Sequence, residues 1–398
     1  MIYRHTPQQI QEYYDNPAIN QSALKAILKV GVEQFITEQA QVIHEDELFF
    51  EEKEHFLIGK AVDCLLTEGK EVFDTAYFYS KLQKKPGEKP MAIVKKIFET
   101  TEPQNRHRYL VNHKRELYDT MNSIVGADGK VGYYLNNKVP SDKLIKGEPD
   151  TRTWEDDKRY LNLLADGTCQ AYWDELQEAG GKRVLTESQN ELVQKIYNSF
   201  TTHHFTRHLF NEEIYTNEHI DIIYQLPCYW IQPVPAIVNG AGIIVDEEMK
   251  CLIDATIVNH SKKQISPFDA KTTGFPITRF NRQIKHRRYD IQGSVYMRGL
   301  NACKSTITEI VGKPVYDYNI QNFAFVAEST VSPGTPLIFP LHTALLDIGE
   351  KGDGDEMLGW RDAIQEYVTY KGHNCNVTDL MESHRGICWV DSDFEIFK

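Results

Sequence analysis

The sequence predicts an α/β protein in which helices flank a mixed central β-sheet. Lys250–Thr273 alternates apolar and polar residues on both sides of a polar turn at Ser261–Lys263, which is the pattern of a β-hairpin. Apolar residues at helical spacing precede it in Glu51–Glu68 and follow it in Ile277–Leu300, and Asn322–Ala327 is a further apolar strand. The order helix, hairpin, helix, strand predicts layers packed around one sheet.

Length and composition indicate a globular protein. The 398 residues allow one large domain with insertions or two domains, and 41% hydrophobic and 25% charged residues are typical of soluble chains. No apolar run approaches the ~20 residues of a membrane span, and the first residues lack the basic and apolar regions of a secretion signal. We therefore expect a cytoplasmic protein with no membrane partner.

Cysteine usage and net charge narrow the function classes. The seven cysteines are scattered and none has C-x-x-C spacing, which argues against a zinc site, an iron–sulfur cluster and a disulfide framework. We expect them to be reduced and mostly buried. The net charge of −13 lowers the expectation of nucleic-acid binding, because proteins that grip phosphates usually have a basic surface. An acidic protein can still bind nucleic acid if a basic channel lies behind its acidic exterior.

Two helices are predicted near the N-terminus. Asn20 or Ser22 can cap the first. Its apolar stripe consists of Leu24, Ile27 and Leu28. The second is Glu51–Glu68, with Gly69 placed to end it. Asp63 interrupts the apolar part of this helix, so its carboxylate faces either solvent or a charged group.

A polar stretch at 81–165 divides the chain. It is rich in Lys, Glu, Asp, Asn and Pro and has weak periodicity, so we expect an inserted polar helical region between an N-terminal helical part, 1–80, and the main core, 166–398. Within the insertion, Ala92–Phe98 and Arg115–Ile124 are the predicted helices.

Regular patterns resume after the insertion. The predicted segments are a helix from Gln170 through Ala179, a Gly180-Gly181 turn, a helix over Thr186–Phe200, one or two strands within Ile214–Trp230, strand pieces at Leu337–Pro340 and Thr343–Leu346, and a helix over Met357–Tyr370.

The predicted hairpin carries charge where strands usually do not. Folding it about its turn places Asp254 beside Asp269 or Lys271, about 5 Å apart at Cβ. Two carboxylates that close repel unless a cation lies between them, and oxygen ligands suit Mg²⁺ or Mn²⁺. Lys271 shares the face of Asp269 and can hold or activate a water at the metal. A surface hairpin with a salt bridge is the open alternative.

The predicted helix after the hairpin combines polar, aromatic and basic residues. Lys285, Tyr289, Gln292 and Tyr296 recur on one helical face. Beside the acidic hairpin, this helix is arranged to hold a phosphate chain next to a metal. The residues expected to contact this phosphate chain are Arg279, Arg282, Lys285, Arg287, Arg288 and Tyr296. An amphipathic helix with a basic surface is the simpler alternative.

Several segments together resemble the exonuclease VIII (RecE-type) branch of the PD-(D/E)XK nuclease superfamily, which is common in phages. An acid followed, after a hairpin turn, by acid-x-lysine is the superfamily pattern. The matching segments are Tyr14–Leu24, Gly59–Leu66 with Phe73, Lys182–Phe210, Asp254, Asp269–Thr273 and Tyr289-x-x-Gln292-x-x-x-Tyr296. The resemblance covers about 13–80 and 170–370 and implies a restriction-endonuclease-like core, in a bacterial host cytoplasm if a phage encodes the chain.

The resemblance also implies a role for each matching residue. Asp254, Asp269 and the Ala270 carbonyl would ligate Mg²⁺ or Mn²⁺, and Lys271 would orient the attacking water. Gln292 and Tyr289 would steady the lysine, the water or the phosphate. Double-stranded DNA would be the substrate, a single-strand annealing protein a partner, and a ring-shaped homo-oligomer the assembly.

Two positions depart from the family pattern. Asp63 stands where this branch usually has histidine, and its oxygen can still bind a hard metal. Gln225 stands near the place of an acidic residue, and its neutral side chain would weaken a second metal site unless Glu213 or Glu218 supplies the charge.

These observations lead to three hypotheses. The first is a metal-dependent deoxyribonuclease, an exonuclease on duplex DNA that produces single strands for recombination. The second, motivated by Asp63 and Gln225, is a catalytically weakened DNA-binding or assembly module of the same fold. The third is a metal hydrolase that acts on another phosphate ester.

Overall fold

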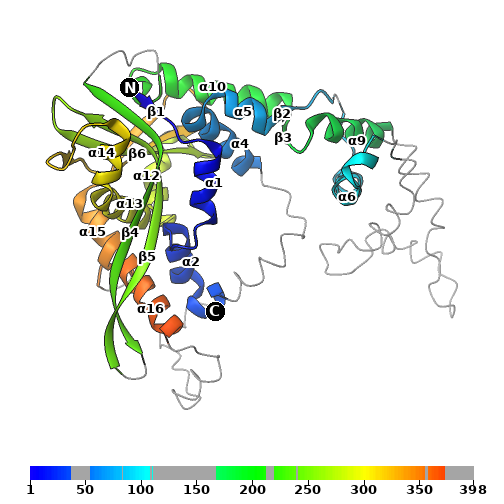
Figure 1. The fold of residues 1–398 in the computed structure, drawn as a ribbon. Helices are drawn as coiled ribbons and strands as arrows, with labels where there is room; N and C mark the ends of the chain where they lie inside the picture. The colour runs from blue at the N-terminus through cyan, green and yellow to red at the C-terminus, as the bar shows by residue number, and fades with distance from the viewer. Residues whose placement is uncertain are drawn as a thin grey trace, which may run out of the picture. The chain divides into compact units, whose positions relative to one another are not determined.

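A mixed β-sheet forms the centre of the larger of two compact units (Figure 1). The computed structural model describes residues 1–36, 54–82, 84–107, 110, 167–211, 219–238, 241–354 and 357–372. The larger unit comprises 1–72 and 193–398, and the smaller comprises 73–192. The predicted α/β class with a mixed sheet flanked by helices is confirmed.

Seven strands from the described ranges make the sheet, in the order β1-β4-β5-β6-β8-β9, with β7 also paired to β6. Parallel pairs join β1 to β4 and β6 to β7 and β8, and the other pairs are antiparallel. The strands are β1 Ile2–Tyr3, β4 Ile220–Val238, β5 Ala241–Asn259, β6 Gln264–Thr273, β7 Asn319–Ile320, β8 Ala324–Ser329 and β9 Leu337–Pro340.

The predicted hairpin is present as β5 and β6. They run antiparallel around a turn at 260–263, with Ala255 opposite Phe268. Continued by one residue, this register places Asp254 opposite Asp269, which is one of the two neighbours, Asp269 or Lys271, that the sequence predicted for it. The pairing of β4 with β5 is much longer than expected, because it continues beyond Trp230 to Val238 opposite Ala241.

Helices of the larger unit pack around the sheet (Figure 1). Asn20 caps the first predicted helix, as expected, because its Oδ1 accepts from the Ser22 and Ala23 amides. The segment Thr343–Leu346, predicted as a strand, is the start of a helix, since His342 Nδ1 accepts from the Ala344 amide and caps it. The helices are α1 Pro7–Asp15, α2 Gln21–Val30, α4 Glu54–Asp63, α12 Phe280–His286, α13 Tyr289–Ala302, α14 Lys304–Val311, α15 Thr343–Lys351 and α16 Trp360–Gly372.

The basic segment after the hairpin is not one helix. A short 3₁₀ turn over Ile277–Arg279 leads into α12, and Arg288, with φ 50°, separates α12 from α13. The left-handed conformation of Arg288 turns the chain between the two helices. The predicted continuous face from Lys285 to Tyr296 is therefore wrong, because α12 and α13 have different axes.

Close packing of α13 on the sheet depends on a glycine. A Cβ at Gly299 would lie 2.6 Å from Cys251 Sγ and 2.8 Å from Trp230 Cζ3. Bare backbone at this position lets the helix approach β4 and β5, where its apolar side chains join the main core. This packing fixes the residues at the start of α13 relative to β6.

The smaller unit has its own core. Helix α6, Glu88–Thr100, packs on α9, Gly167–Ala179, around Trp173 and Phe98, and β2, Tyr77–Tyr79, pairs in parallel with β3, Arg183–Leu185. Helix α6 confirms the helix predicted at 92–98. The helix predicted at 115–124, residues 51–53 of the second helix, Glu213 and Glu218 lie outside the described residues. Helix α10, Glu187–Thr202, begins in this unit and ends in the larger one.

None of the helices in the described segments is long and apolar enough to cross a membrane. Five cysteines in the described part of the chain are buried, as the sequence predicted. They are Cys64, Cys169, Cys228, Cys251 and Cys303.

Candidate functional site

Strand β5 leaves the regular ladder on both sides at Asp254. On the β4 side, the pairing is interrupted at Gln225, which lies opposite Asp254 and has φ 51°. On the β6 side, the paired residues of β5 are Ala255–Asn259, so the pairing stops next to Asp254. The Ala270 amide, which has no ladder partner on this side, donates to Asp254 Oδ2 at 2.8 Å. The Asp254 carboxylate thus takes the place of a backbone acceptor and turns toward β6.

The strained Gln225 gives the first prediction. A non-glycine residue in the left-handed region costs about 1 kcal/mol or more, whereas glycine in an ordinary strand is less stable than alanine. We therefore expect the free energy of unfolding of Gln225→Gly to exceed that of Gln225→Ala by about 1 kcal/mol. Equilibrium urea unfolding measures the difference. If the Gln225→Ala variant is as stable as the Gln225→Gly variant, or more stable, residue 225 does not hold this backbone conformation in solution.

Asp269 is the most enclosed of the predicted acids, with 1% of its surface exposed. Gln292 Nε2 donates to its Oδ1 at 2.7 Å, and the Lys271 ammonium forms an ion pair with its Oδ2. Lys271 is two residues along β6 and lies on the same face, as predicted. Burial alone would lower the pKa of Lys271, but the nearby Asp269 and Asp254 carboxylates raise it, so this amine stays charged.

Asp63 enters the same region from another element. It is the last residue of α4, and a π-helical turn over Cys64–Glu68 follows it directly. Helix α4 lies close to the end of β6, since a Cβ at Gly59 would lie 3.2 Å from Thr272 Oγ1. Asp63 is one turn beyond Gly59 and so faces β6 as well. π-Helical turns within helices are frequent at functional sites.

The electrostatics show that these acids share one environment. Burial, together with Asp269, raises the pKa of Asp63 to about 7. Burial, with Asp269 and Asp63 adding, raises the pKa of Asp254 well above its usual value. Asp63 Oδ1 is buried and accepts no hydrogen bond from any residue that the structure describes. A bound cation would offset the repulsion that, with burial, raises the pKa of Asp63 and Asp254.

We tested whether these residues fit the divalent metal that the resemblance implies. The donors are hard oxygens, one of them unsatisfied and buried, which suits Mg²⁺ or Mn²⁺. Across the described ranges, however, no three His, Cys, Asp or Glu side chains are close enough together to hold an ion as they stand. The Lys271 ammonium neutralises Asp269 at this point. The donor chemistry therefore fits a metal, while the arrangement is that of carboxylates held by an amine.

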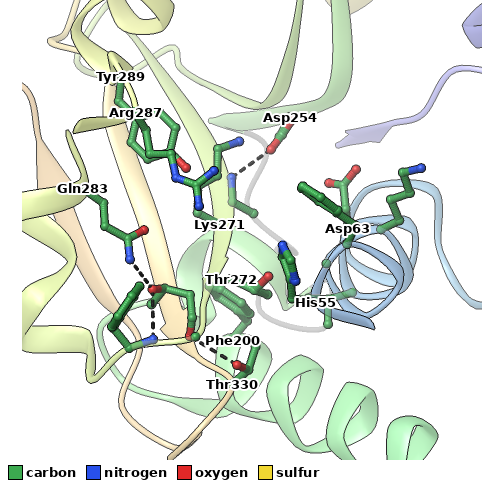
Figure 2. Close-up of a pocket in the computed structure, with 18 residues that line it drawn as sticks. His55, Asp63, Phe200, Asp254, Lys271, Thr272, Gln283, Arg287, Tyr289 and Thr330 are labelled. Carbon is green, nitrogen blue, oxygen red and sulfur yellow. Dashed lines mark hydrogen bonds between the residues drawn. The ribbon is translucent and has the colours of Figure 1, made fainter. Parts of the chain in front are cut away.

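A pocket of about 610 Å³ opens at this group of acids. Helix α4 supplies one wall, residues 270–275 supply another, and Gln283, Arg287 and Tyr289 supply a third. Figure 2 shows Asp63 on α4 facing the strand that carries Lys271, with Arg287 and Tyr289 beyond the strand. Asp254, Ala270 and Lys271 line the pocket, whereas Asp269 is not among its lining residues. Two of the predicted acids, Asp63 and Asp254, thus lie at a cavity large enough for part of a substrate.

The expected DNA contacts divide into two groups. Arg279, Arg282, Lys285 and Arg287 are exposed, and Arg287 also lines the pocket. Two others need correction. Arg288 is held by the buried Asp290 at 3.0 Å and by the Leu358 carbonyl at 2.7 Å, so its guanidinium stabilises the fold. Tyr296 is 3% exposed and accepts from Gln21 Nε2 at 3.2 Å, which leaves its ring inside the protein.

Two charged residues near the site were not predicted. Lys25 on α2 places its ammonium 5.2 Å from the Tyr289 ring centroid, and burial together with Lys271 lowers the pKa of Lys25 to about 8. Glu328 on β8 is fully buried beside Thr272 and accepts from Ser199 Oγ, the Ser329 amide and the Gly334 amide. Glu328 thereby joins α10, the end of β8 and the following loop. Neither residue stands in a recognisable motif, so the sequence alone offers no signal for them.

Comparison with known proteins adds no family assignment. The sequence matches no protein-family model, and a search of curated proteins finds no match.

Proposed function

We propose that the chain is a metal-dependent deoxyribonuclease with a PD-(D/E)XK core. The observation that carries this proposal is the hairpin that brings Lys271, which is paired with the buried Asp269, together with Asp254 at the pocket that Asp63 also lines. A helix with exposed basic side chains begins within a few residues of the same hairpin. Acids that need a cation, next to side chains that suit phosphates, are what hydrolysis of a phosphodiester requires.

Each residue has a role in this proposal. Asp63, Asp254, Asp269 and the Ala270 carbonyl would hold Mg²⁺ or Mn²⁺, which when bound offsets the charge of the phosphodiester and lowers the pKa of a water. Lys271 orients that water through its N–H donors. Gln292 keeps Asp269 in one orientation through its hydrogen bond. Arg287 and Tyr289, at the pocket wall, bind the phosphate oxygens.

The family resemblance supplies the finer parts of the proposal. We propose that the enzyme is an exonuclease that degrades double-stranded DNA from its ends and leaves single strands for recombination. A single-strand annealing protein would be its partner and a homo-oligomeric ring its assembly. A ring would also let an acidic chain of net charge −13 present a basic inner wall to DNA.

A comparison of DNA forms tests this proposal. With Mg²⁺ or Mn²⁺, we expect linear duplex to be degraded to single strands and nucleotides, and covalently closed circular duplex of the same sequence to stay intact, because only the linear form has ends. Gel electrophoresis and acid-soluble label measure both. Equal cleavage of both forms would contradict an exonuclease, and no cleavage of either would contradict a nuclease.

A catalytically weakened DNA-binding module is the second candidate. It is favoured by the neutral Gln225 opposite Asp254 and by the amine that already neutralises Asp269. DNA binding without metal uptake at millimolar Mg²⁺ and without cleavage would favour this module over the enzyme.

A further inference from the structure

Two phenylalanine side chains are exposed at the pocket of the candidate site. Phe56 on α4 has 49% of its surface exposed, and Phe275, just after β6, has 53%. Both line the pocket that Asp254 and Lys271 also line. Large apolar side chains are normally buried, so two half-exposed rings in one pocket indicate a ligand with apolar faces.

Hydrogen bonds to the Thr273 side chain hold the backbone of Phe275 in this position. Thr273 Oγ1 accepts from the Phe275 amide at 3.3 Å and from Gln283 Nε2 at 2.8 Å. Pro276 follows and restricts the backbone. On the other wall, the His55 ring contacts Phe56, with centroids 4.3 Å apart and planes tilted by 37°. Both rings are therefore supported by neighbours in the protein while exposing much of their surface.

The charge around Phe275 indicates what the ligand is. Residues 274–288 contain five Arg or Lys side chains and no Asp or Glu. Arg279, Arg282, Lys285 and Arg287 among them are exposed. A ligand that has flat apolar faces along an anionic chain satisfies both the rings and the cations, and a single strand of nucleic acid has this chemistry.

We propose that Phe56 and Phe275 form a base-stacking site for one separated DNA strand, whose phosphates follow the basic residues of 279–287 toward Lys271. This inference rests on the proposed function, because it assigns the strand that the nuclease site receives. In a duplex the base faces are already stacked on their neighbours, so only a separated strand offers them to the rings. Every base has an aromatic face, and the site therefore binds without sequence preference.

Binding to uncut single strands tests the proposal apart from cleavage. Fluorescence anisotropy of a labelled oligothymidylate, in EDTA to prevent hydrolysis, gives Kd for the wild type and for Phe56→Ala and Phe275→Ala. We expect each substitution to weaken binding at least about fivefold, the loss of one stacked base. An oligonucleotide of abasic sites loses the stacking on both rings, so it should bind the wild type more weakly by about the product of the two factors, and the two substitutions should then make no further difference.

Tyr316→Ala is the matched control. Tyr316 is 61% exposed and precedes β7, which pairs with the opposite end of β6 from the pocket. Its removal should leave Kd unchanged. Equal binding by wild type, both phenylalanine variants and the control would overturn the stacking site, as would equal affinity for thymidylate and abasic strands or no binding by the wild type. Failure of the nuclease proposal is seen separately, as intact linear duplex in Mg²⁺ while the binding differences persist.

Discussion

Lys271→Gln should reduce hydrolysis of linear duplex DNA at least about a hundredfold, the usual size of the contribution from a side chain that positions a proton or a water. The ammonium of Lys271 is the cation in direct contact with Asp269 and also lies near Asp254. Glutamine keeps the length and an N–H donor but removes the charge. The loss should appear in the rate at saturating DNA rather than in DNA binding, because Arg287 and the exposed residues of 279–285 remain.

Asp269→Asn should also reduce hydrolysis of linear duplex DNA at least about a hundredfold. Its carboxylate is buried and bonded by Gln292 and Lys271, so the amide retains most of the packing and removes the negative charge. Initial rates with Mg²⁺ and with Mn²⁺ measure both variants, and circular dichroism confirms that they fold. Lys262→Ala, an exposed lysine in the turn of the same hairpin, is the control and should keep full activity. Degradation that survives both site substitutions would refute the assignment of the site.

Asp63 should make the metal-free protein less stable as the pH rises. Its pKa is about 7 in the folded protein and 3.8 in the unfolded chain, so the folded state binds the proton more tightly. The stability from this protonation is fully present below pH 3.8 and is lost as the pH rises through about 7. The shift corresponds to at most about 4 kcal/mol of unfolding free energy. In EDTA, Asp63→Asn should therefore be more stable than the wild type at pH 8 and similar to it at pH 4.

Thermal unfolding between pH 4 and 8 in EDTA measures this difference. Asp347→Asn, an exposed aspartate on α15, is the control and should follow the wild type at every pH. Millimolar Mn²⁺ at pH 8 should raise the melting temperature of the wild type and not that of Asp63→Asn, since binding to the folded state alone stabilises it. Parallel pH profiles for the wild type and Asp63→Asn would contradict a buried, partly protonated Asp63.

Local patterns sufficed to predict the hairpin and its acids. Strand alternation and the polar turn predict the register within one residue, which left Asp254 beside either Asp269 or Lys271. The observed pairing of Ala255 with Phe268 places Asp254 opposite Asp269. The approach of Asp63 is a tertiary contact: it depends on bare backbone at Gly59 against Thr272, and no periodicity in α4 reveals it. For that reason, the sequence could not decide whether the Asp63 carboxylate faces solvent or a charged group.

Two predictions failed because hydrophobic periodicity carries no information about local backbone conformation. They are the continuous helix through Arg288 and the length of β4. Helical spacing continues through Arg288, but its left-handed conformation ends α12 there. Tyr296 lies on the face of α13 that packs into the core. The length of β4 was missed because Pro233 and Pro235 argue against a strand, although prolines are tolerated on strands with a free edge. Lys25 lies near the site only because α2 packs on α13.

The central claim is that Asp63, Asp254 and Asp269 accept one divalent cation, and calorimetric titration of the metal-free protein with Mn²⁺ at pH 8 tests it most directly. The wild type and Asp347→Asn should take up the ion at millimolar concentration or below, and Asp254→Asn and Asp63→Asn should take it up at least about tenfold more weakly. No uptake by the wild type, or equal uptake by all four proteins, would contradict the account.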